Sequence, residues 1–164
     1  MIELKPFEVN DWRYLQRWIG NEAELTQFAG PIFSFPVDRT QVERYLSNPN
    51  RTVFRIEDND NQPIGMAEIS DEGGGVAKLA RILIGERSMR GWGIGTELMR
   101  QLTDYGFQRL NAERLILNVY AWNLSAIRCY EKAGFRRTDK CPVVVTVGTE
   151  AWETIEMEKA SDTN

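Results

Sequence analysis

Residues 79–99, LARILIGERSMRGWGIGTELM, contain a strand, a glycine-rich turn and the start of a helix. Apolar residues run to Ile84, glycines stand at positions 91, 93 and 95, and apolar residues recur at helical spacing from Ile94. Glycines at a helix N-terminus let successive backbone N–H groups point at one anion, and the helix dipole favours negative charge there. The segment therefore predicts a phosphate-binding turn, with Arg90 beside it as a cation.

Other phosphate-binding motifs fit this turn less well. A dinucleotide fingerprint that starts at Gly91 requires glycine or alanine at the position of Thr96, and a P-loop requires Gly-Lys-Ser/Thr after a longer gap. A helix start whose glycines serve only tight packing stays open as the simpler interpretation. A nucleotide-binding module also stays open.

The rest of the chain alternates between strand-like and helical patterns. Helices are expected over 12–19 with Asp11 as N-cap, 39–46, 94–110 and 125–133, and 28–36 is expected to be an aromatic loop. Strands are expected over 2–5, 52–57, 63–69, 77–84, 114–120, 135–138 and 151–159. These elements predict an α/β fold in one domain, residues 1–160, with a loose tail over residues 161–164.

Composition narrows the function and the compartment. The 164 residues are 42% hydrophobic and 27% charged, which predicts an ordinary packed core. The net charge of -4 argues against a nucleic-acid partner, and no apolar run reaches the length of about 20 residues that a membrane helix needs. Two cysteines and a start without a signal-like segment favour a cytoplasmic protein.

The chain has no histidine. An imidazole base, a Ser-His-Asp triad and a His-ligated zinc are therefore excluded. Cys129 and Cys141 are too few for a cysteine-only cluster, so no metal is expected. Catalysis has to rely on carboxylates, tyrosine, backbone amides or a bound cosubstrate.

A second segment, NVYAWNLSAIRCYEKAGF over 118–135, gives the glycine turn a context. Arg90-x-x-Gly93-x-Gly95, followed by Asn123-x-x-Ala126-x-x-x-Tyr130-x-x-x-Gly134-Phe135, resembles the GNAT superfamily of acyl-CoA-dependent N-acyltransferases. The two motifs span about a third of the chain. The aromatic loop over 28–36 is also similar, more weakly, to the RimJ/RimL-type branch that acetylates ribosomal-protein N-termini.

The resemblance implies a mixed, mostly antiparallel central sheet with helices on both faces, splayed between its two central strands. It implies acetyl-CoA as cosubstrate and an amine as acceptor, with direct attack of the amine in a ternary complex. It also implies a set of residues that bind the cosubstrate: Leu83, Ile84, Gly85, Arg90, Gly91, Trp92, Gly93, Ile94, Gly95, Thr96, Asn123 and Tyr130. Self-association as a homodimer is left open.

Two of the implied roles are catalytic. Tyr130 corresponds to the family's tyrosine that protonates the leaving thiolate, and its alternative role is to pack its helix. The family's frequent glutamate base aligns with Asn118, which cannot take a proton. Glu68 is then the first candidate base, with Glu72, Glu86 and water as the others.

For two further residues the sequence allows a purely structural role as well as a functional one. Asn123 is equally well interpreted as a helix N-cap, and Cys129, without a histidine partner, as a small buried hydrophobe. The acceptor is not defined by the sequence. The alternative to an enzyme is a non-catalytic acyl-CoA-binding sensor or interaction domain.

Overall fold

The computed structural model describes residues 1–162, which divide into two compact units. The first unit comprises Met1–Glu68 and Ala80–Ile94, and the second comprises Ile69–Leu79 and the chain from Gly95 onward. Strands β3 (Pro63–Gly73) and β4 (Val76–Ile84) belong to both units. The single domain over 1–160 stays a prediction, and residues 163–164 of the expected tail lie outside the described residues.

Within the described residues, eight strands form one sheet in the order β1-β2-β3-β4-β5-β8-β6, and β7 also pairs with β8. The pairs β1/β2, β5/β8, β6/β8 and β7/β8 are antiparallel, and β4/β5 is parallel. The α/β fold with a mixed, mostly antiparallel sheet is therefore confirmed. The remaining strands are β1 (Glu3–Pro6), β2 (Arg51–Glu57), β5 (Arg114–Tyr120), β6 (Arg136–Arg137), β7 (Val143–Val147) and β8 (Glu150–Ala160).

The parallel pair β4/β5 is short. Its register runs from Val76 opposite Arg114 to Leu79 opposite Leu117. Strand β4 continues to Ile84, beyond the last paired residue. The expected splay of the central strands is consistent with this early end of the register.

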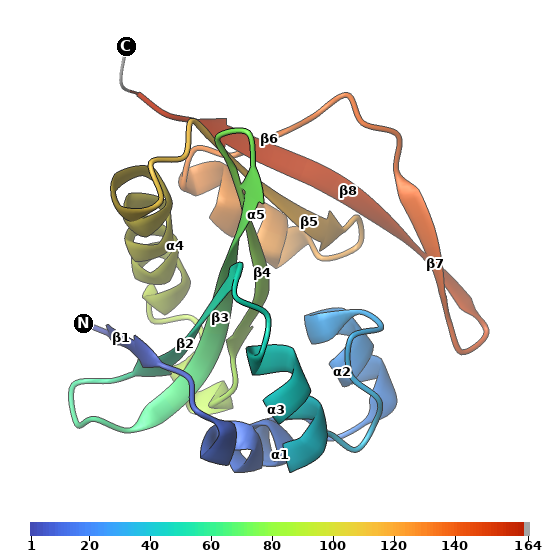
Figure 1. The fold of residues 1–164 in the computed structure, drawn as a ribbon. Helices are drawn as coiled ribbons and strands as arrows, with labels where there is room; N and C mark the ends of the chain where they lie inside the picture. The colour runs from blue at the N-terminus through green and yellow to red at the C-terminus, as the bar shows by residue number, and fades with distance from the viewer. Residues whose placement is uncertain (163–164) are drawn as a thin grey trace. The chain divides into compact units, whose positions relative to one another are not determined.

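Three helices pack on the strands of the first unit (Figure 1): α1 (Trp12–Trp18), α2 (Glu22–Ala29) and α3 (Arg39–Leu46). Their apolar faces form a core with β2 and β3, in which Leu15 and Val42 of the helices meet Val53 and Met66 of the strands. Short 3₁₀ turns lie at Val9–Asp11 and Arg87–Met89.

The structure differs from the expectations for this unit in two respects. Helix α2 was not predicted, and Phe28, which was placed in the loop 28–36, lies on it. Asp11 is the N-cap residue of α1, as expected, but its carboxylate accepts from the Glu8 N–H at 2.8 Å and makes no capping bond to the helix. It also pairs with Arg55, at 3.1 Å from Nη1.

Except for its first residue, α4 (Ile94–Asp104) belongs to the second unit and continues as a π-helical turn over Tyr105–Arg109. The second unit also contains α5 (Leu124–Lys132). The π-helical turn packs closely on the sheet, since a Cβ at Gly106 would lie 2.6 Å from Cδ2 of Leu115 and 3.1 Å from Cδ1 of Ile69. The β7–β8 hairpin ends the fold (Figure 1), and its strand β7 was not predicted. Of the helices described, none is long and apolar enough to cross a membrane.

Candidate active site

The glycine turn has the conformation that the sequence requires. Gly91 has a φ of 83° and Gly93 a φ of 78°, both in the left-handed region that favours glycine, and α4 begins directly after Gly93. Both glycines are exposed, as is Thr96 in the first helical turn. The first backbone N–H groups of α4 have no partner inside the helix, so the turn can cradle an anion.

The Arg90 side chain lies at the end of β4. Its Nε donates to the carbonyl of Ile84 at 2.8 Å, which uses one of the five N–H groups of the guanidinium. The N–H of Gly85 donates to the carbonyl of Ile64 on β3 at 2.7 Å. The N–H of Glu86 donates to the same carbonyl at 3.1 Å, so the strand alternation does not continue past Gly85. The carbonyl of Leu83 lies against Gly65 of β3. Because the C=O and N–H of one trans peptide point in opposite directions, the N–H of Ile84 faces the edge opposite β3. Among Leu83, Ile84 and Gly85, the strand residues expected to bind pantetheine, Ile84 is thus the one whose N–H points to the edge of β4 that faces away from β3.

Gly85 is needed for close packing. A Cβ there would lie 2.1 Å from Cδ2 of Trp18, which is buried in the first unit. Leu83 packs on the same core.

Trp92 is 79% exposed and donates from Nε1 to the carbonyl of Ser88 at 3.1 Å. It borders an apolar pocket that Met1, Ile2, Met89 and Ile94 also line.

Asn123 caps helix α5. Its Oδ1 accepts from the N–H of Ala126 and from the hydroxyl of Ser125, both at 3.4 Å. These bonds are long, so the amide is not tightly held. The N-cap role that the sequence left open is therefore present, and it leaves the amide nitrogen available for a ligand.

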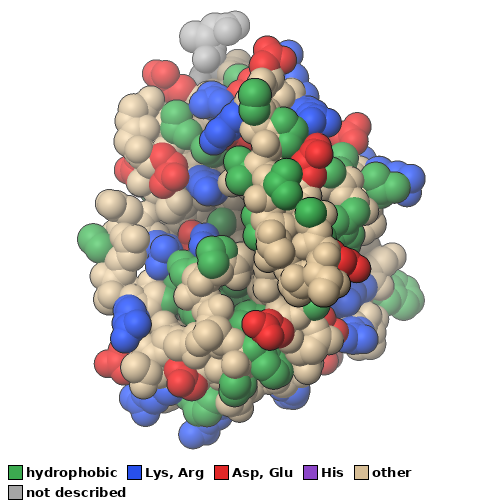
Figure 2. Space-filling view, turned by 90° about the vertical axis from the view of Figure 1, so that its right-hand side faces the viewer, with side chains coloured by type: hydrophobic (Ala, Val, Ile, Leu, Met, Phe, Trp, Pro, Cys, Tyr) green, Lys and Arg blue, Asp and Glu red, His purple; other side chains and the backbone are tan. Residues whose placement is uncertain are grey.

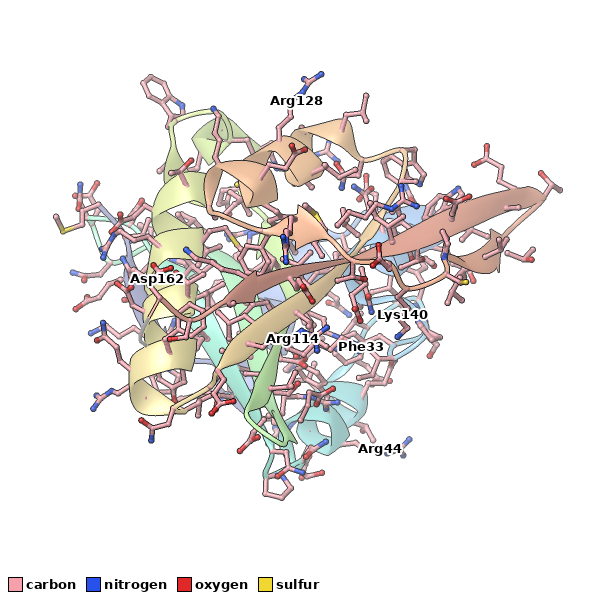
Figure 3. The ribbon with its side chains drawn as sticks, turned by 90° about the horizontal axis from the view of Figure 1, so that it is seen from above. Phe33, Arg44, Arg114, Arg128, Lys140 and Asp162 are labelled. Atoms are coloured by element: carbon pink, nitrogen blue, oxygen red, sulfur yellow. The ribbon has the colours of Figure 1, made fainter. Side chains whose placement is uncertain are left out.

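Tyr130 is a half-buried residue of α5. Arg128 projects outward from this helix (Figure 3), and a residue two positions further along is turned by about 200°. Burial, with a smaller effect of Cys129, raises the pKa of Tyr130 to about 12. Within residues 1–162 its hydroxyl has no hydrogen-bond partner from the protein. The phenol is therefore protonated at neutral pH and can donate to a ligand.

Cys129 faces α4. Its Sγ would lie 3.2 Å from a Cβ at Gly95, so the glycine allows the two helices to approach closely. Burial raises the pKa of the Cys129 thiol, which keeps it protonated and a poor nucleophile. This environment matches the interpretation of Cys129 as a small hydrophobe.

Glu68 is buried in a charged cluster of the first unit, with 2% of the residue exposed. Its Oε1 accepts from the Tyr45 hydroxyl and lies 3.4 Å from Nε of Arg51. Its Oε2 accepts from Nη1 of Arg81 at 3.2 Å. Burial and the Glu68 carboxylate raise the pKa of Tyr45. The geometry therefore opposes a role for Glu68 as a general base, because both oxygens are engaged.

The other candidate bases differ in their surroundings. Glu86 accepts from Nε1 of Trp18 at 2.9 Å and also pairs with Arg17. These partners hold the pKa of Glu86 below its usual range. Glu72 is exposed and accepts from Ser70 at 3.2 Å. Asn118 is exposed on β5, opposite Glu156 of β8.

The sequence analysis missed an aromatic cluster in the second unit, formed by Tyr120, Trp122 and Trp152. The ring centroids of Tyr120 and Trp152 are 4.9 Å apart, and those of Trp122 and Trp152 are 5.2 Å apart. Trp122 is 46% exposed, and Nε1 of Trp152 donates to Glu150 at 2.9 Å. Tyr120 and Trp122 stand in the quoted segment over 118–135, but nothing in the sequence indicates that Trp152 lies beside them.

The expected site residues fall in both units. The first unit holds Glu68 and the run from Leu83 to Ile94, and the second holds Gly95, Thr96, Asn123 and Tyr130. Figure 2 shows acidic and basic side chains interspersed over the face that it presents. Among the described residues, no group of three or more His, Cys, Asp or Glu side chains could hold a metal ion.

The glycine turn before α4, the tyrosine of α5 and the mixed sheet are the features expected from the resemblance to acyl-CoA-dependent N-acyltransferases. The acetyltransferase (GNAT) family profile matches residues 17–135, and the chain belongs to this family. It is an N-acetyltransferase that uses acetyl-CoA as cosubstrate.

Individual relatives agree with this assignment. An aminoglycoside N(6')-acetyltransferase type 1 of Klebsiella pneumoniae is 42% identical over 151 residues, which cover 83% of this chain and 74% of that protein. A spermidine N(1)-acetyltransferase of Escherichia coli (strain K12) is 26% identical over 135 residues, 82% of this chain and 72% of that protein. The match to a Bacillus subtilis N-acetyltransferase, YobR, is 35% identical over 88 residues and spans only 34% of that relative.

A solved structure supports the fold. The spermidine N-acetyltransferase of Vibrio cholerae, solved in complex with CoA and spermine, has a TM-score of 0.80 to this chain at 19% identity. The likeness covers 97% of this chain and 95% of that one. The GNAT fold expected from the two motifs is therefore confirmed.

Proposed function

We propose that this enzyme transfers the acetyl group of acetyl-CoA to a primary amine of a polycationic acceptor, with an aminoglycoside as the first candidate. The observation that carries the cosubstrate site is the exposed glycine turn, with left-handed Gly91 and Gly93 directly before α4. Such a turn fits a pyrophosphate, because several N–H groups and the helix dipole meet at one point. Arg90 adds a cation, and Ile84 offers its N–H to the pantetheine arm.

Tyr130 is the proposed acid. The amine attacks the thioester carbonyl, and its nitrogen loses a proton to solvent. The tetrahedral intermediate then collapses, and the carbon–sulfur bond breaks. The phenol then donates its proton to the leaving thiolate of CoA and regains one from solvent. A pKa raised to about 12 keeps this proton on Tyr130 until the thiolate forms.

Direct attack requires no covalent enzyme intermediate. The chain has no histidine to activate Cys129, and burial raises the pKa of its thiol. The proton of the ammonium acceptor is proposed to leave to water before attack, since Glu68 and Glu86 are both engaged with other side chains. The protein then contributes positioning and electrostatics.

The acceptor class is supported by the relatives and by charge. The relative with 42% identity is an aminoglycoside acetyltransferase, and the one with 26% identity is a spermidine acetyltransferase. Both of these acceptors, aminoglycosides and spermidine, are polycations. The net charge of this chain is -4, which favours a cationic partner over an anionic one. The cluster of Tyr120, Trp122 and Trp152 offers ring faces that can bind a sugar or an ammonium group.

The test is a CoA-release assay across a panel of amines. The panel contains aminoglycosides with and without a 6'-amine, spermidine, amino acids and N-terminal peptides. We expect the fastest release with a 6'-amino aminoglycoside, and the second candidate is spermidine. Release that is fastest with N-terminal peptides would instead support the RimJ/RimL-type branch. Binding of acetyl-CoA without release for any amine would support the sensor alternative.

Two further expectations accompany this function. A cytoplasmic location is proposed because both cysteines, Cys129 and Cys141, are free thiols. The homodimer stays a prediction, which light scattering of the purified chain tests directly.

A further inference from the structure

Arg81 has a backbone conformation that is unusual for its residue type. It lies in the interior of β4 with a φ of 45°, in the left-handed region that bulky side chains rarely adopt. A left-handed residue in a strand is typical of a β-bulge, which bends the strand and re-aims the residues after it. The pairing of β4 with β5 ends at Leu79, two residues earlier. We call this feature the Arg81 kink.

The Arg81 side chain is anchored in the charged cluster around Glu68. Nη1 of Arg81 donates to Oε2 of Glu68 at 3.2 Å, and the Tyr45 hydroxyl bonds to the other oxygen. The Arg51 guanidinium lies 4.4 Å from the ring centroid of Tyr45 and donates to its carbonyl at 2.7 Å. One carboxylate thus joins α3, β2 and β3 to the kink in β4.

This cluster is poorly optimised for stability alone. Within the described residues, the Nε atoms of Arg51 and Arg81 are buried without a hydrogen-bond partner. A buried ion pair with unsatisfied donors contributes little to stability compared with apolar packing. Strained backbone conformations that persist are often held for function. The cluster therefore calls for an explanation other than folding.

We propose that Glu68 and Arg81 are positioning residues whose ion pair holds the Arg81 kink, so that Ile84 presents its N–H to acetyl-CoA. The kink determines which edge of β4 the next backbone groups face. The Leu83 carbonyl lies against Gly65 of β3, so the N–H of Ile84 in the same peptide faces the other edge. If residue 81 relaxed to a regular strand, a one-residue slip would exchange these directions. This inference rests on the proposed pantetheine contact of Ile84.

The decisive comparison is between Arg81→Gly and Arg81→Ala. Both variants remove the ion pair between Arg81 and Glu68. In both of them Glu68 retains its hydrogen bond from Tyr45 and its ion pair with Arg51. Glycine adopts a positive φ without steric cost, whereas alanine does not. We expect Arg81→Ala to raise KM for acetyl-CoA on the order of tenfold with little change in kcat, and Arg81→Gly to stay within about threefold of the wild type.

The Glu68→Gln variant provides a second test of the ion pair. It keeps the shape of the side chain but weakens the anchor, so KM for acetyl-CoA should rise in the wild-type background and not in the Arg81→Gly background. Melting curves of all variants show whether a change reflects unfolding, and the glycine/alanine pair decides the question even where Glu68→Gln does not fold. Equal KM values for Arg81→Gly and Arg81→Ala would overturn the proposal. So would a Glu68→Gln variant that loses kcat together with the acidic limb of its pH profile, because that limb reports the deprotonation of a general base.

A calorimetric titration of the wild type with CoA separates this inference from the proposed function. Absence of CoA binding would refute the cosubstrate site itself. Binding to the wild type that Arg81→Ala leaves unchanged would refute only the positioning role of the kink.

Discussion

Replacing Gly93 by aspartate should abolish binding of acetyl-CoA through charge and not through a clash. A Cβ at Gly93 meets no described atom within 4 Å, so the new side chain finds open space at the turn. A carboxylate about 5 Å from a phosphate, at an effective dielectric constant of about 20, is repelled by about 3 kcal/mol. This repulsion corresponds to a loss of affinity of more than about a hundredfold.

Gly93→Asn is the matched control. Asparagine has nearly the same shape as aspartate and tolerates a positive φ similarly well, so both variants carry the same backbone cost of about 1 kcal/mol in stability. Calorimetric titration with CoA at two ionic strengths gives the affinity of each folded variant. We expect the affinity for CoA to be much lower for Gly93→Asp than for Gly93→Asn, and we expect this difference in affinity to become smaller at higher salt. Equal affinities of the two variants would refute the pyrophosphate site at this turn.

Four further predictions concern three other residues. Tyr130→Phe should lower kcat about 10- to 1,000-fold with little change in acetyl-CoA affinity, and wild-type rates in steady-state and single-turnover assays would rule out the acid role. Because the pKa of Tyr130 is about 12, the wild-type rate should also show no decline from its ionisation between pH 7 and about 10. Gly85→Ala should cost about 1 to 3 kcal/mol in urea unfolding by displacing the Trp18 indole, and a cost that persists unchanged in a Trp18→Ala background would contradict this cause. Cys129→Ala should keep kcat within about threefold of the wild type, whereas loss of turnover in a folded variant would favour a covalent route.

Local sequence patterns were sufficient for the elements around the glycine turn. The apolar run of β4, the glycines and the helical spacing of α4 lie within residues 79–105, and each is a short-range signal. The missed helix α2 also had a local signal. Asn21 caps it by accepting from the N–H of Glu24 at 2.8 Å, but the aromatic residues that follow directed the interpretation toward a loop.

The surroundings of Glu68 could not be predicted in this way. Its partners Tyr45, Arg51 and Arg81 come from three other elements, and only the fold brings them together. From the sequence, Glu68 was a carboxylate at the end of a strand and hence a candidate base. In the structure it is buried, with both oxygens engaged.

The most direct test of the acetyl transfer is a single assay that follows CoA release and product mass together. The purified chain is incubated with acetyl-CoA and a 6'-amino aminoglycoside, and a matched aminoglycoside without the 6'-amine serves as control. We predict stoichiometric release of CoA, one acetyl group added to the 6'-amino compound, and little turnover of the control. CoA release at the same slow rate with and without any amine, and no acetylated product from the panel, would contradict amine acetylation by this chain.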